Sequence, residues 1–305
     1  MTPEDVLRFH QDRGREYLAY AYPDSAAIYP TGARRTEAAA AALQGELGAA
    51  AGNAIDLGCG RGDLCCLLAA VGTTVAGIDF SETMLAEART RLASLPADAR
   101  ARVSLIHADI YGNGVNDGSV DAVAAIGVLE TEPSDAALFA EARRMLRAGG
   151  VFVVSCRNRL FNLVSVNRHT RAELDAGTLG DLLAEAEELL QASSPTTTAG
   201  ALTGFADRMR EAAALPRGES IAAAPAAVRI GETRQHTPVQ LKRFAHGNGF
   251  HGGTFIGVHP HPLPPVMEAM EPAAYNRIAA AAEAFQHEPM GLVWSSAFVA
   301  AFTKR

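Results

Sequence analysis

Short apolar runs alternate with helical stretches over residues 53–156, and this alternation restricts the fold more than any other feature. Five apolar runs are expected to be strands, and they occupy residues 54–58, 74–80, 103–109, 120–127 and 150–156. Helices are expected between them at residues 63–70, 82–92 and 135–146. Strands and helices that alternate at this spacing form right-handed crossovers and a parallel sheet. We therefore expect an α/β fold with a Rossmann-like, mainly parallel sheet. The full architecture that we predict has seven strands, of which the last is antiparallel.

The segments around this alternation complete the expected domain organisation. Residues 1–157 should form an α/β core preceded by helices that start near Thr2 and at residue 34. Residues 158–235 should form a helical cap inserted after the fifth strand, because the strand pattern stops there. Residues 236–305 should complete the core, with an excursion at residues 259–290.

The cap is expected to hold a helix over residues 171–191, with Thr170 and Glu173 as a capping box. A second cap helix is expected over residues 201–214. Beyond the cap, Thr237 followed by proline is typical of a helix start. The other elements expected there are a helix to residue 247, a strand at 253–258, a helix at 273–285 and a last strand at 291–303.

Composition and charge restrict the possible partners. No apolar run in the 305 residues approaches the roughly 20 needed to span a membrane, and the first residues lack the order of a signal peptide. A net charge of −7 argues against a nucleic-acid partner, since such proteins usually carry a basic surface. The four cysteines show neither zinc spacing nor a disulfide framework. We expect a cytoplasmic protein with a small-molecule partner, no membrane contact and no metal.

A glycine-rich loop follows the first expected strand and has the pattern D-x-G-x-G-x-G. It contains Asp56, Gly58, Cys59, Gly60 and Gly62. Ligands of open parallel sheets bind at the carboxyl ends of the strands, where glycine lets the backbone approach closely. A tight turn without a ligand is the alternative. Because dinucleotide enzymes use G-x-G-x-x-G, and because Asp56 would repel a pyrophosphate and attract a cationic group, the loop favours S-adenosylmethionine over NAD.

Two further acids end the next two expected strands. Asp79 stands where a carboxylate can accept both hydroxyls of a ribose, a feature that NAD enzymes share. Asp109 is placed to accept a hydrogen bond from an adenine amino group, while Phe80 and Ile110 offer apolar contacts to the ring. Acids at three successive strand ends are a more specific signal than any one of them.

The ordered segments AIDLGCGRGDL, GIDFSETML, HADI, DAVAAIGVLET and LRAGGVFVVS resemble the motifs of class I S-adenosylmethionine-dependent methyltransferases. The resemblance covers residues 53–156, with a weaker part in HTPVQLKRFAHGNGF, and it is similar in detail to the small-molecule, quinone-type O-methyltransferase branch. It implies that Asp56 and the loop lie near the methionine part of the cofactor and Asp79 on the ribose. The other implied cofactor-binding residues are Phe80, Met84, Asp109, Ile110 and Ile126.

One position departs from this resemblance. Many relatives carry Glu-His after the fourth strand, where this chain has Glu130-Thr131. A catalytic or metal role for that histidine therefore does not carry over. Another residue must supply any base.

Histidine is the natural candidate for a general base on the acceptor side. His236 precedes the helix start at Thr237, and His259 and His261 follow the sixth expected strand, so all three should lie at the carboxyl face of the sheet. His169 is a fourth candidate. For each one alone, a structural or solvated role is the competing interpretation.

Two other groups bear on the acceptor. A basic stretch after the fifth strand either pairs with carboxylates or recognises an anionic acceptor, and it contains Arg157, Arg159, Arg168 and Arg171. Aromatic residues near the start could close over the site or only pack, and they are Tyr17, Tyr20, Tyr22 and Tyr29.

The sequence therefore predicts an S-adenosylmethionine-dependent enzyme that methylates a small molecule, most readily at oxygen. N- or C-methylation on the same fold is the first alternative. A nicotinamide-dependent oxidoreductase and a non-catalytic cofactor-binding protein are the others.

Overall fold

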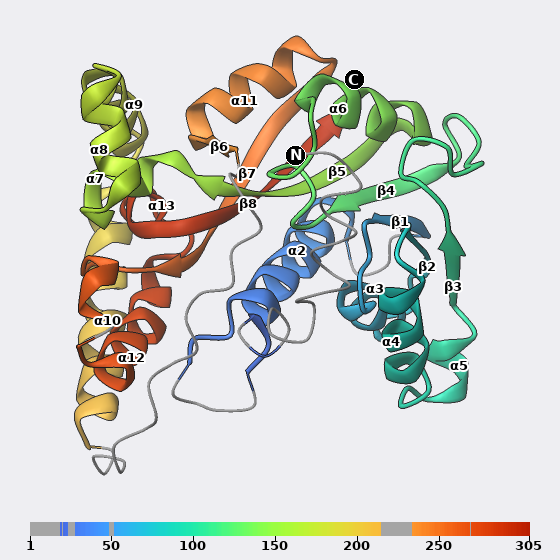
Figure 1. Ribbon diagram of the computed structural model, residues 1–305, viewed down its shortest axis with the longest axis horizontal. Helices are drawn as coiled ribbons and strands as arrows, with labels where there is room; N and C mark the ends of the chain where they lie inside the picture. The colour runs from blue at the N-terminus through green and yellow to red at the C-terminus, as the bar shows by residue number, and fades with distance from the viewer. Residues whose placement is uncertain (1–18, 20, 24–27, 49–51, 215–233, 269) are drawn as a thin grey trace.

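Eight strands form one mixed sheet in the computed structural model, which describes residues 19, 21–23, 28–48, 52–214, 234–268 and 270–305 (Figure 1). The strand order is β3-β2-β1-β4-β5-β8-β7, and β6 pairs with the end of β5. Strands β1 to β6 pair in parallel, whereas β8 is antiparallel to both β5 and β7. The strands are β1 Asn53–Leu57, β2 Thr74–Asp79, β3 Val103–His107, β4 Val120–Ala125, β5 Leu146–Asn158, β6 Gln235–His236, β7 Phe250–Pro260 and β8 Ser295–Lys304.

This sheet confirms the predicted Rossmann-like architecture and its antiparallel last strand. The eighth strand is the two-residue β6, which is too short to leave a pattern in the sequence. The helix predicted from Thr2, and Tyr17 and Tyr20, lie outside the described residues.

Helices cover both faces of the sheet because alternate residues of its strands point to opposite sides. One face packs Phe152, Val154 and Phe298 against α6 (Asp135–Met145) and α11 (Pro238–Gly247). The other face packs the intervening Val153 and Val299 against α2, α3 and α4. These helices comprise α2 Thr31–Leu47, α3 Asp63–Ala70 and α4 Glu82–Leu92, and Figure 1 shows the two layers on either side of the sheet. A short α5 (Ala97–Arg100) precedes β3.

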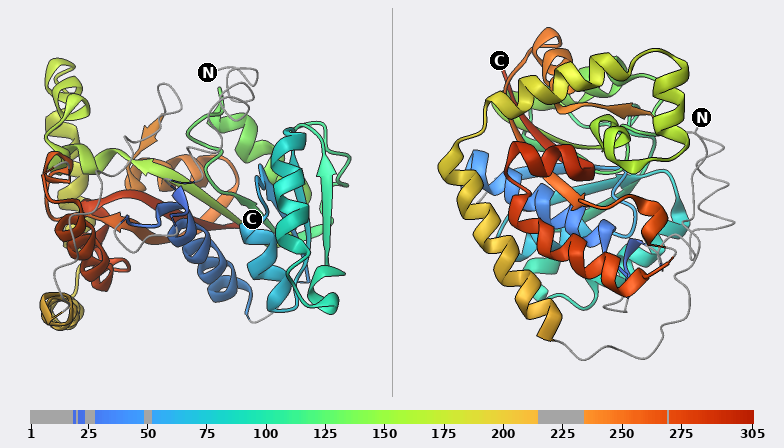
Figure 2. Two further views of the ribbon diagram at one scale, coloured as in Figure 1. Left: turned by 60° about the horizontal axis from the view of Figure 1, so that its bottom comes forward. Right: turned by 90° about the vertical axis from the view of Figure 1, so that its left-hand side faces the viewer.

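A third group of helices gathers where β5 and β7 end (Figure 2). Among them, α10 packs against α12, and α13 packs against α9. The group comprises η1 Arg159–Phe161, α7 Asn162–Ser165, α8 Arg168–Asp175, α9 Leu179–Gln191, α10 Pro195–Ala214, η2 Pro265–Met267, α12 Pro272–Ala282, η3 Glu283–Phe285 and α13 Pro289–Trp294.

The helix predicted over residues 171–191 is two helices, α8 and α9. Gly177 lies between them with φ +70° and turns the chain. The predicted capping box of Thr170 and Glu173 is wrong, because the box that forms has Asn167 as its N-cap residue and Thr170 as its N3 partner. Glu173 instead faces Arg159, and that long-range pairing leaves no trace in the local sequence.

Two other element boundaries differ from the prediction. Helix α10 begins at Pro195 rather than residue 201, so it includes the threonines that precede residue 201. The predicted last strand at 291–303 begins at Ser295, because residues Pro289–Trp294 form α13 after a proline that favours a helix start.

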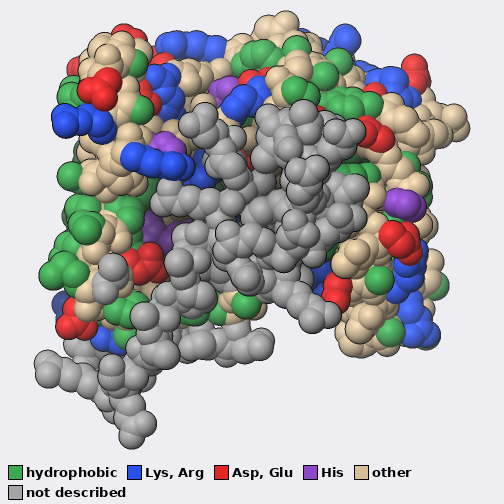
Figure 3. Space-filling model, viewed as in Figure 1, with side chains coloured by type: hydrophobic (Ala, Val, Ile, Leu, Met, Phe, Trp, Pro, Cys, Tyr) green, Lys and Arg blue, Asp and Glu red, His purple; other side chains and the backbone are tan. Residues whose placement is uncertain are grey.

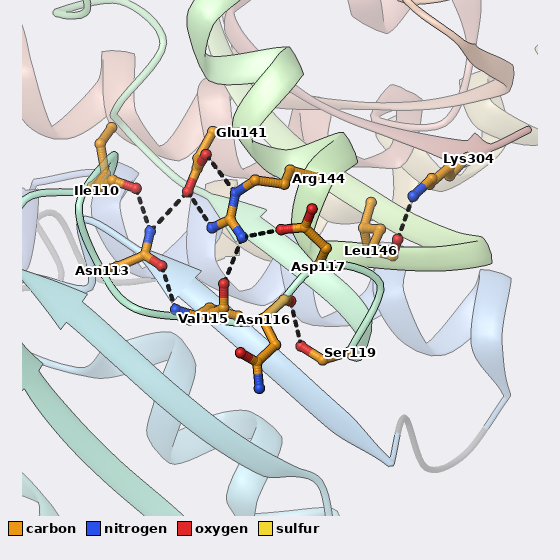
Figure 4. Close-up of polar contacts among 10 residues, drawn as sticks. All are labelled: Ile110, Asn113, Val115, Asn116, Asp117, Ser119, Glu141, Arg144, Leu146 and Lys304. Atoms are coloured by element: carbon orange, nitrogen blue, oxygen red, sulfur yellow. Dashed lines mark hydrogen bonds and ion pairs between the residues drawn. The ribbon is translucent and has the colours of Figure 1, made fainter.

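The long loop between β3 and β4 is fastened to α6 (Figure 4). Asn113 Nδ2 donates to Glu141 Oε1 over 3.0 Å, and Asn113 Oδ1 accepts from the Val115 amide. Arg144 donates to Glu141 over 2.7 Å and to Asp117 over 2.7 Å. These contacts hold the part of the loop that follows Asp109 in one place.

Within the described residues, none of the helices combines the length and apolar character needed to cross a bilayer. All four cysteines are buried free thiols, as the absence of a disulfide pattern predicts.

Candidate functional site

The loop between β1 and α3 is built from three glycines in the left-handed region. Gly58, Gly60 and Gly62 have φ of +67°, +52° and +76°. A Cβ added to Gly58 would lie 2.6 Å from Cγ2 of Val128, so only glycine fits there. The Gly58 amide donates to the Ile78 carbonyl over 2.8 Å, which joins the loop to β2. The loop thus exposes backbone at the carboxyl end of the sheet.

Asp79 ends β2 and is buried beside this loop. Its Oδ2 accepts the Gly60 amide over 2.9 Å, and its Oδ1 accepts the Ser81 amide over 2.8 Å. Ser81 in turn caps α4 by accepting the Met84 amide. Met84 Cε lies 3.3 Å from where a Gly60 Cβ would be. The structure therefore brings Gly60, Asp79 and Met84 together, as the sequence predicts.

Asp56 lies beneath the loop, with its carboxyl group toward α3. It is 2% exposed, and Oδ2 accepts from the Cys65 thiol over 3.5 Å. Burial raises the pKa of Asp56 to about 7, against the opposing effect of the Cys65 hydrogen bond. Cys59 packs close by, since both it and Cys65 would contact a Cβ at Gly77. A cationic ligand group above the loop would favour the ionised form of this carboxyl group.

The residues that follow β3 lie at the next strand end. Asp109 is exposed and accepts the Tyr111 amide over 2.9 Å, while Ile110 is buried in the core. The Tyr111 hydroxyl donates to Glu132 Oε2 over 2.6 Å, so this loop touches the loop that follows β4. At the neighbouring strand ends, Phe80 is half-buried after β2 and Ile126 after β4. The predicted cofactor-binding residues thus lie at the carboxyl ends of β1 to β4 or in the loop and helix start that directly follow them.

His236 lies in line with β4, beyond its carboxyl end. Strand β4 pairs with β5 as far as Ala125 and Val154. Further along β5, the short strand β6 pairs with it instead, and His236 lies opposite Asn158. His236 Nε2 is 3.0 Å from Asp135 Oδ2, an ion-pair distance rather than an aligned hydrogen bond.

Asp135 opens α6 and also pairs with Arg234, whose Nη1 is 2.7 Å from Oδ1. Burial tends to raise the pKa of Asp135, but His236 and Arg234 outweigh it and lower that pKa. Neither Asp135 nor Arg234 is among the site residues predicted from the sequence. The serine that precedes Asp135 marks a helix N-terminus, but it gives no sign that a residue about 100 positions away meets it.

His259 and His261 belong to a buried column of rings. His259 stacks on Tyr29 with ring centroids 4.2 Å apart, and His261 stacks on Tyr275 at 4.6 Å. Burial, His261 and Arg35 hold the pKa of His259 well below its usual value, and burial lowers that of His261 to about 3. Both imidazoles are therefore neutral at physiological pH. His169 lies apart from this column, on α8.

A second ion pair next to this column was also missed. Arg35 of α2 reaches Glu130, with 3.3 Å between Nη1 and Oε1. The available signal is that Arg35 shares the helix face of the buried Ala39 and Ala42. A cation on an apolar helix face is unusual and indicates a partner.

The basic stretch after β5 is divided in the structure. Arg159 makes two hydrogen bonds to the buried Glu173, of 2.8 and 2.7 Å, so it is carboxylate-paired. Arg168 and Arg171 are exposed. On the described part of the face in Figure 3, basic and acidic side chains alternate over the outer helices. Tyr22 packs on Arg61 of the glycine loop, 3.9 Å from ring centroid to guanidinium carbon.

Over the described ranges, no group of three or more histidine, cysteine or acidic side chains is arranged to hold a metal ion.

Residues 55–154 match a family described as a methyltransferase domain. A probable S-adenosylmethionine-dependent methyltransferase of Mycolicibacterium smegmatis is 35% identical over 136 residues, or 42% of this chain and 49% of the relative. A ubiquinone biosynthesis O-methyltransferase of Thiobacillus denitrificans is 35% identical over 105 residues, or 34% of this chain and 44% of the relative. The chain thus spans less than half the length of these two curated relatives.

Two solved structures share the fold along the whole chain. Magnesium protoporphyrin IX methyltransferase from Synechocystis with bound SAH has a TM-score of 0.56 at 14% identity, with 100% of each chain covered. A possible histamine N-methyltransferase from Thermotoga maritima has a TM-score of 0.52 at 14% identity, also with 100% of each chain covered. At this identity the likeness establishes the architecture alone.

Proposed function

From the methyltransferase domain at residues 55–154, we propose that the protein transfers a methyl group from S-adenosylmethionine to an oxygen atom of a small molecule. The observation that most supports this cofactor is the direct contact between the glycine loop and Asp79, a 2.9 Å hydrogen bond from the Gly60 amide. Backbone, carboxylates and apolar side chains then meet at adjoining strand ends, as a nucleoside with a cationic tail requires.

The residues present fit this cofactor. Each Asp79 oxygen accepts one backbone amide, which fixes the carboxylate at the end of β2 beside the glycine loop, where we place the ribose hydroxyls. Asp109 is exposed for the adenine amino group, next to Ile110 and Phe80. The glycine loop would face the methionine part, and a positive charge there would stabilise the carboxylate of Asp56, which lies beneath the loop. The bound cofactor would supply an electrophilic methyl group on a sulfonium centre.

We assign the general base to His236. The negative charge of Asp135, 3.0 Å from Nε2, favours a proton on that nitrogen, and Nδ1 would then accept the proton of the acceptor hydroxyl. The carboxylate also stabilises the imidazolium that results. His259 and His261 are poorer bases, because a pKa far below neutrality leaves little driving force for proton uptake.

This pairing is what favours oxygen over nitrogen or carbon. An amine or a carbanion-like carbon is already nucleophilic and needs alignment more than a base. A histidine oriented by a carboxylate at the end of β4 serves an acceptor that must lose a proton. We further propose that residues 158–235 and 259–290 cover the acceptor, because they leave the sheet at the ends of β5 and β7.

Two measurements test the function. Calorimetry with S-adenosylmethionine, S-adenosylhomocysteine and NAD should show binding of the first two only, and binding of NAD alone would refute the assignment. An acceptor screen with isotope-labelled S-adenosylmethionine then separates an enzyme from a non-catalytic binder. With an acceptor found, His236→Asn should lower kcat by roughly 10²–10⁴-fold and leave cofactor affinity unchanged.

Asp135→Asn separates a base role from a structural one. It should lower kcat and change the dependence of kcat on pH, because the amide cannot stabilise an imidazolium. Unchanged pH profiles in both variants would exclude His236 as the base and would favour an already nucleophilic nitrogen or carbon.

A further inference from the structure

Tyr111 and Glu132 join two loops that leave the sheet at different strands. The Tyr111 hydroxyl donates to Glu132 Oε2 over 2.6 Å, and the two residues follow β3 and β4. The strand order β3-β2-β1-β4 places β2 and β1 between them. Neighbouring strands are about 4.8 Å apart, so the ends of β3 and β4 are separated by about 14 Å. The Tyr111–Glu132 pair therefore crosses the strand ends that carry Asp79 and the glycine loop.

Both members of the pair are held in place by their own backbone. The Tyr111 amide donates to Asp109 Oδ1 over 2.9 Å, so the tyrosine starts beside the residue that we assign to the adenine amino group. The Glu132 amide donates to the Val128 carbonyl over 3.2 Å. Val128 also lies 2.6 Å from where a Gly58 Cβ would be, so the same turn contacts the glycine loop. The Tyr111 side chain thus extends from the end of β3 toward the loop after β4.

The glycine loop and the pair approach the strand ends from different faces of the sheet. The glycine loop runs into α3, which packs on one face, whereas α6 packs on the other. The loop after β4 runs into α6, and the loop after β3 is fastened to α6 through Asn113 and Glu141 (Figure 4). A ligand along the ends of β2 and β1 would therefore have the glycine loop on one side and Tyr111 on the other.

Tyr111 offers an aromatic surface at this place. It is 40% exposed although its hydroxyl group is engaged, so part of the ring is open to a ligand. Partial burial and the hydrogen bond to Glu132 raise the pKa of Tyr111, which keeps the phenol protonated as a donor. Aromatic side chains stack on the flat faces of nucleobases. A tyrosine tethered at its hydroxyl group would present its ring without first having to be ordered by the ligand.

We propose that Tyr111 packs on the adenosine part of S-adenosylmethionine and that Glu132 holds the tyrosine across the site. The inference rests on the proposed methyl transfer, which requires the cofactor but does not by itself require either residue. Tyr111 is then a further cofactor-binding residue, and Glu132, which acts through it, is a positioning residue. Neither is among the site residues predicted from the sequence.

The test measures calorimetric affinities for S-adenosylhomocysteine and for methylthioadenosine, which keeps the adenosine part and lacks the amino acid. Tyr111→Ala should weaken the binding of both ligands by roughly 10- to 100-fold, because it removes the ring. Tyr111→Phe keeps the ring but loses the hydrogen bond to Glu132. It should weaken the binding of both ligands by a smaller factor, roughly 3- to 10-fold, because the ligand must then order the ring.

Substitutions of Glu132 test the positioning role. Glu132→Ala should bind both ligands as weakly as Tyr111→Phe does, and combining the two changes should cause no further loss, since both remove one interaction. Glu132→Gln keeps an oxygen that can accept from the phenol, so its affinities should stay within about threefold of wild type.

Tyr29→Phe is the matched control for Tyr111→Phe. It also removes a hydrogen bond from a tyrosine hydroxyl to a glutamate, the 2.8 Å contact with Glu283, but neither residue belongs to the loops after β3 and β4. It should keep both affinities. Circular dichroism of each variant shows that the affinities are those of folded protein.

Unchanged affinity of Tyr111→Ala for both ligands would overturn the proposal. So would a loss confined to S-adenosylhomocysteine, because the tyrosine would then act on the amino-acid part. Wild-type affinities in Glu132→Ala would exclude the positioning role. Failure of wild type to bind S-adenosylhomocysteine would instead refute the methyl transfer itself, and the role of Tyr111 would fall with it.

Discussion

Replacing Glu173 with glutamine should destabilise the protein in a pH-dependent way. The Glu173 side chain is 9% exposed and accepts from Arg159, Asn162 and Thr178. The Arg159 hydrogen bonds are the largest cause of a pKa that is lowered from the ordinary 4.5 to about 2, against the effect of burial. A difference of that size corresponds to about 3 kcal/mol of folding free energy at pH 7.

The sign follows from the direction of the shift. Because the folded pKa is below the unfolded one, the stabilisation is complete above about pH 5 and is lost as the pH falls toward 2. The difference in unfolding free energy between wild type and Glu173→Gln should be about 3 kcal/mol at pH 7 and roughly half of that near pH 3. Urea titrations at a series of pH values measure it.

Glu188→Gln is the matched control for this substitution. Glu188 also pairs with an arginine, Arg243 at 2.6 Å, but both side chains are more than half exposed. Its loss should therefore change the unfolding free energy by less than about 1 kcal/mol. The reasoning would be refuted if Glu173→Gln changed the unfolding free energy as little as this control does. It would also be refuted if the difference in unfolding free energy between wild type and Glu173→Gln did not decrease at acidic pH.

The cofactor loop gives two more predictions. Asp79→Ala should weaken S-adenosylhomocysteine binding by roughly 10- to 100-fold in calorimetry, and Asp109→Ala by less, because Asp109 is exposed. Equal losses of affinity in the two variants would contradict the ribose assignment. Gly58→Ala should lower both stability and cofactor affinity, because its φ is positive and the new Cβ would lie 2.6 Å from Val128. The control Gly72→Ala has φ +97° but open space around it, so it should lower the unfolding free energy by roughly 1–3 kcal/mol through backbone strain and leave cofactor affinity unchanged.

The glycine loop and its acids were predictable because their geometry is local. Each acid ends a strand whose apolar pattern is visible, and parallel strands bring their carboxyl ends to one edge. Asp56, Asp79 and Asp109 therefore lie at neighbouring strand ends as expected. The parallel part of the sheet follows from the same alternation of apolar runs and helices.

The acceptor side was decided by contacts between residues far apart in the chain. Asp135 meets His236 and Arg35 meets Glu130 only because β6 continues the line of β4 and α2 packs under the sheet. Side chains 95 or more positions apart leave no periodic signal, since periodicity reports which face of an element is buried and not what it faces. Whether a histidine such as His259 is a base or a neutral hydrogen-bonding group depends on burial and nearby charge, which exist only once the chain has folded.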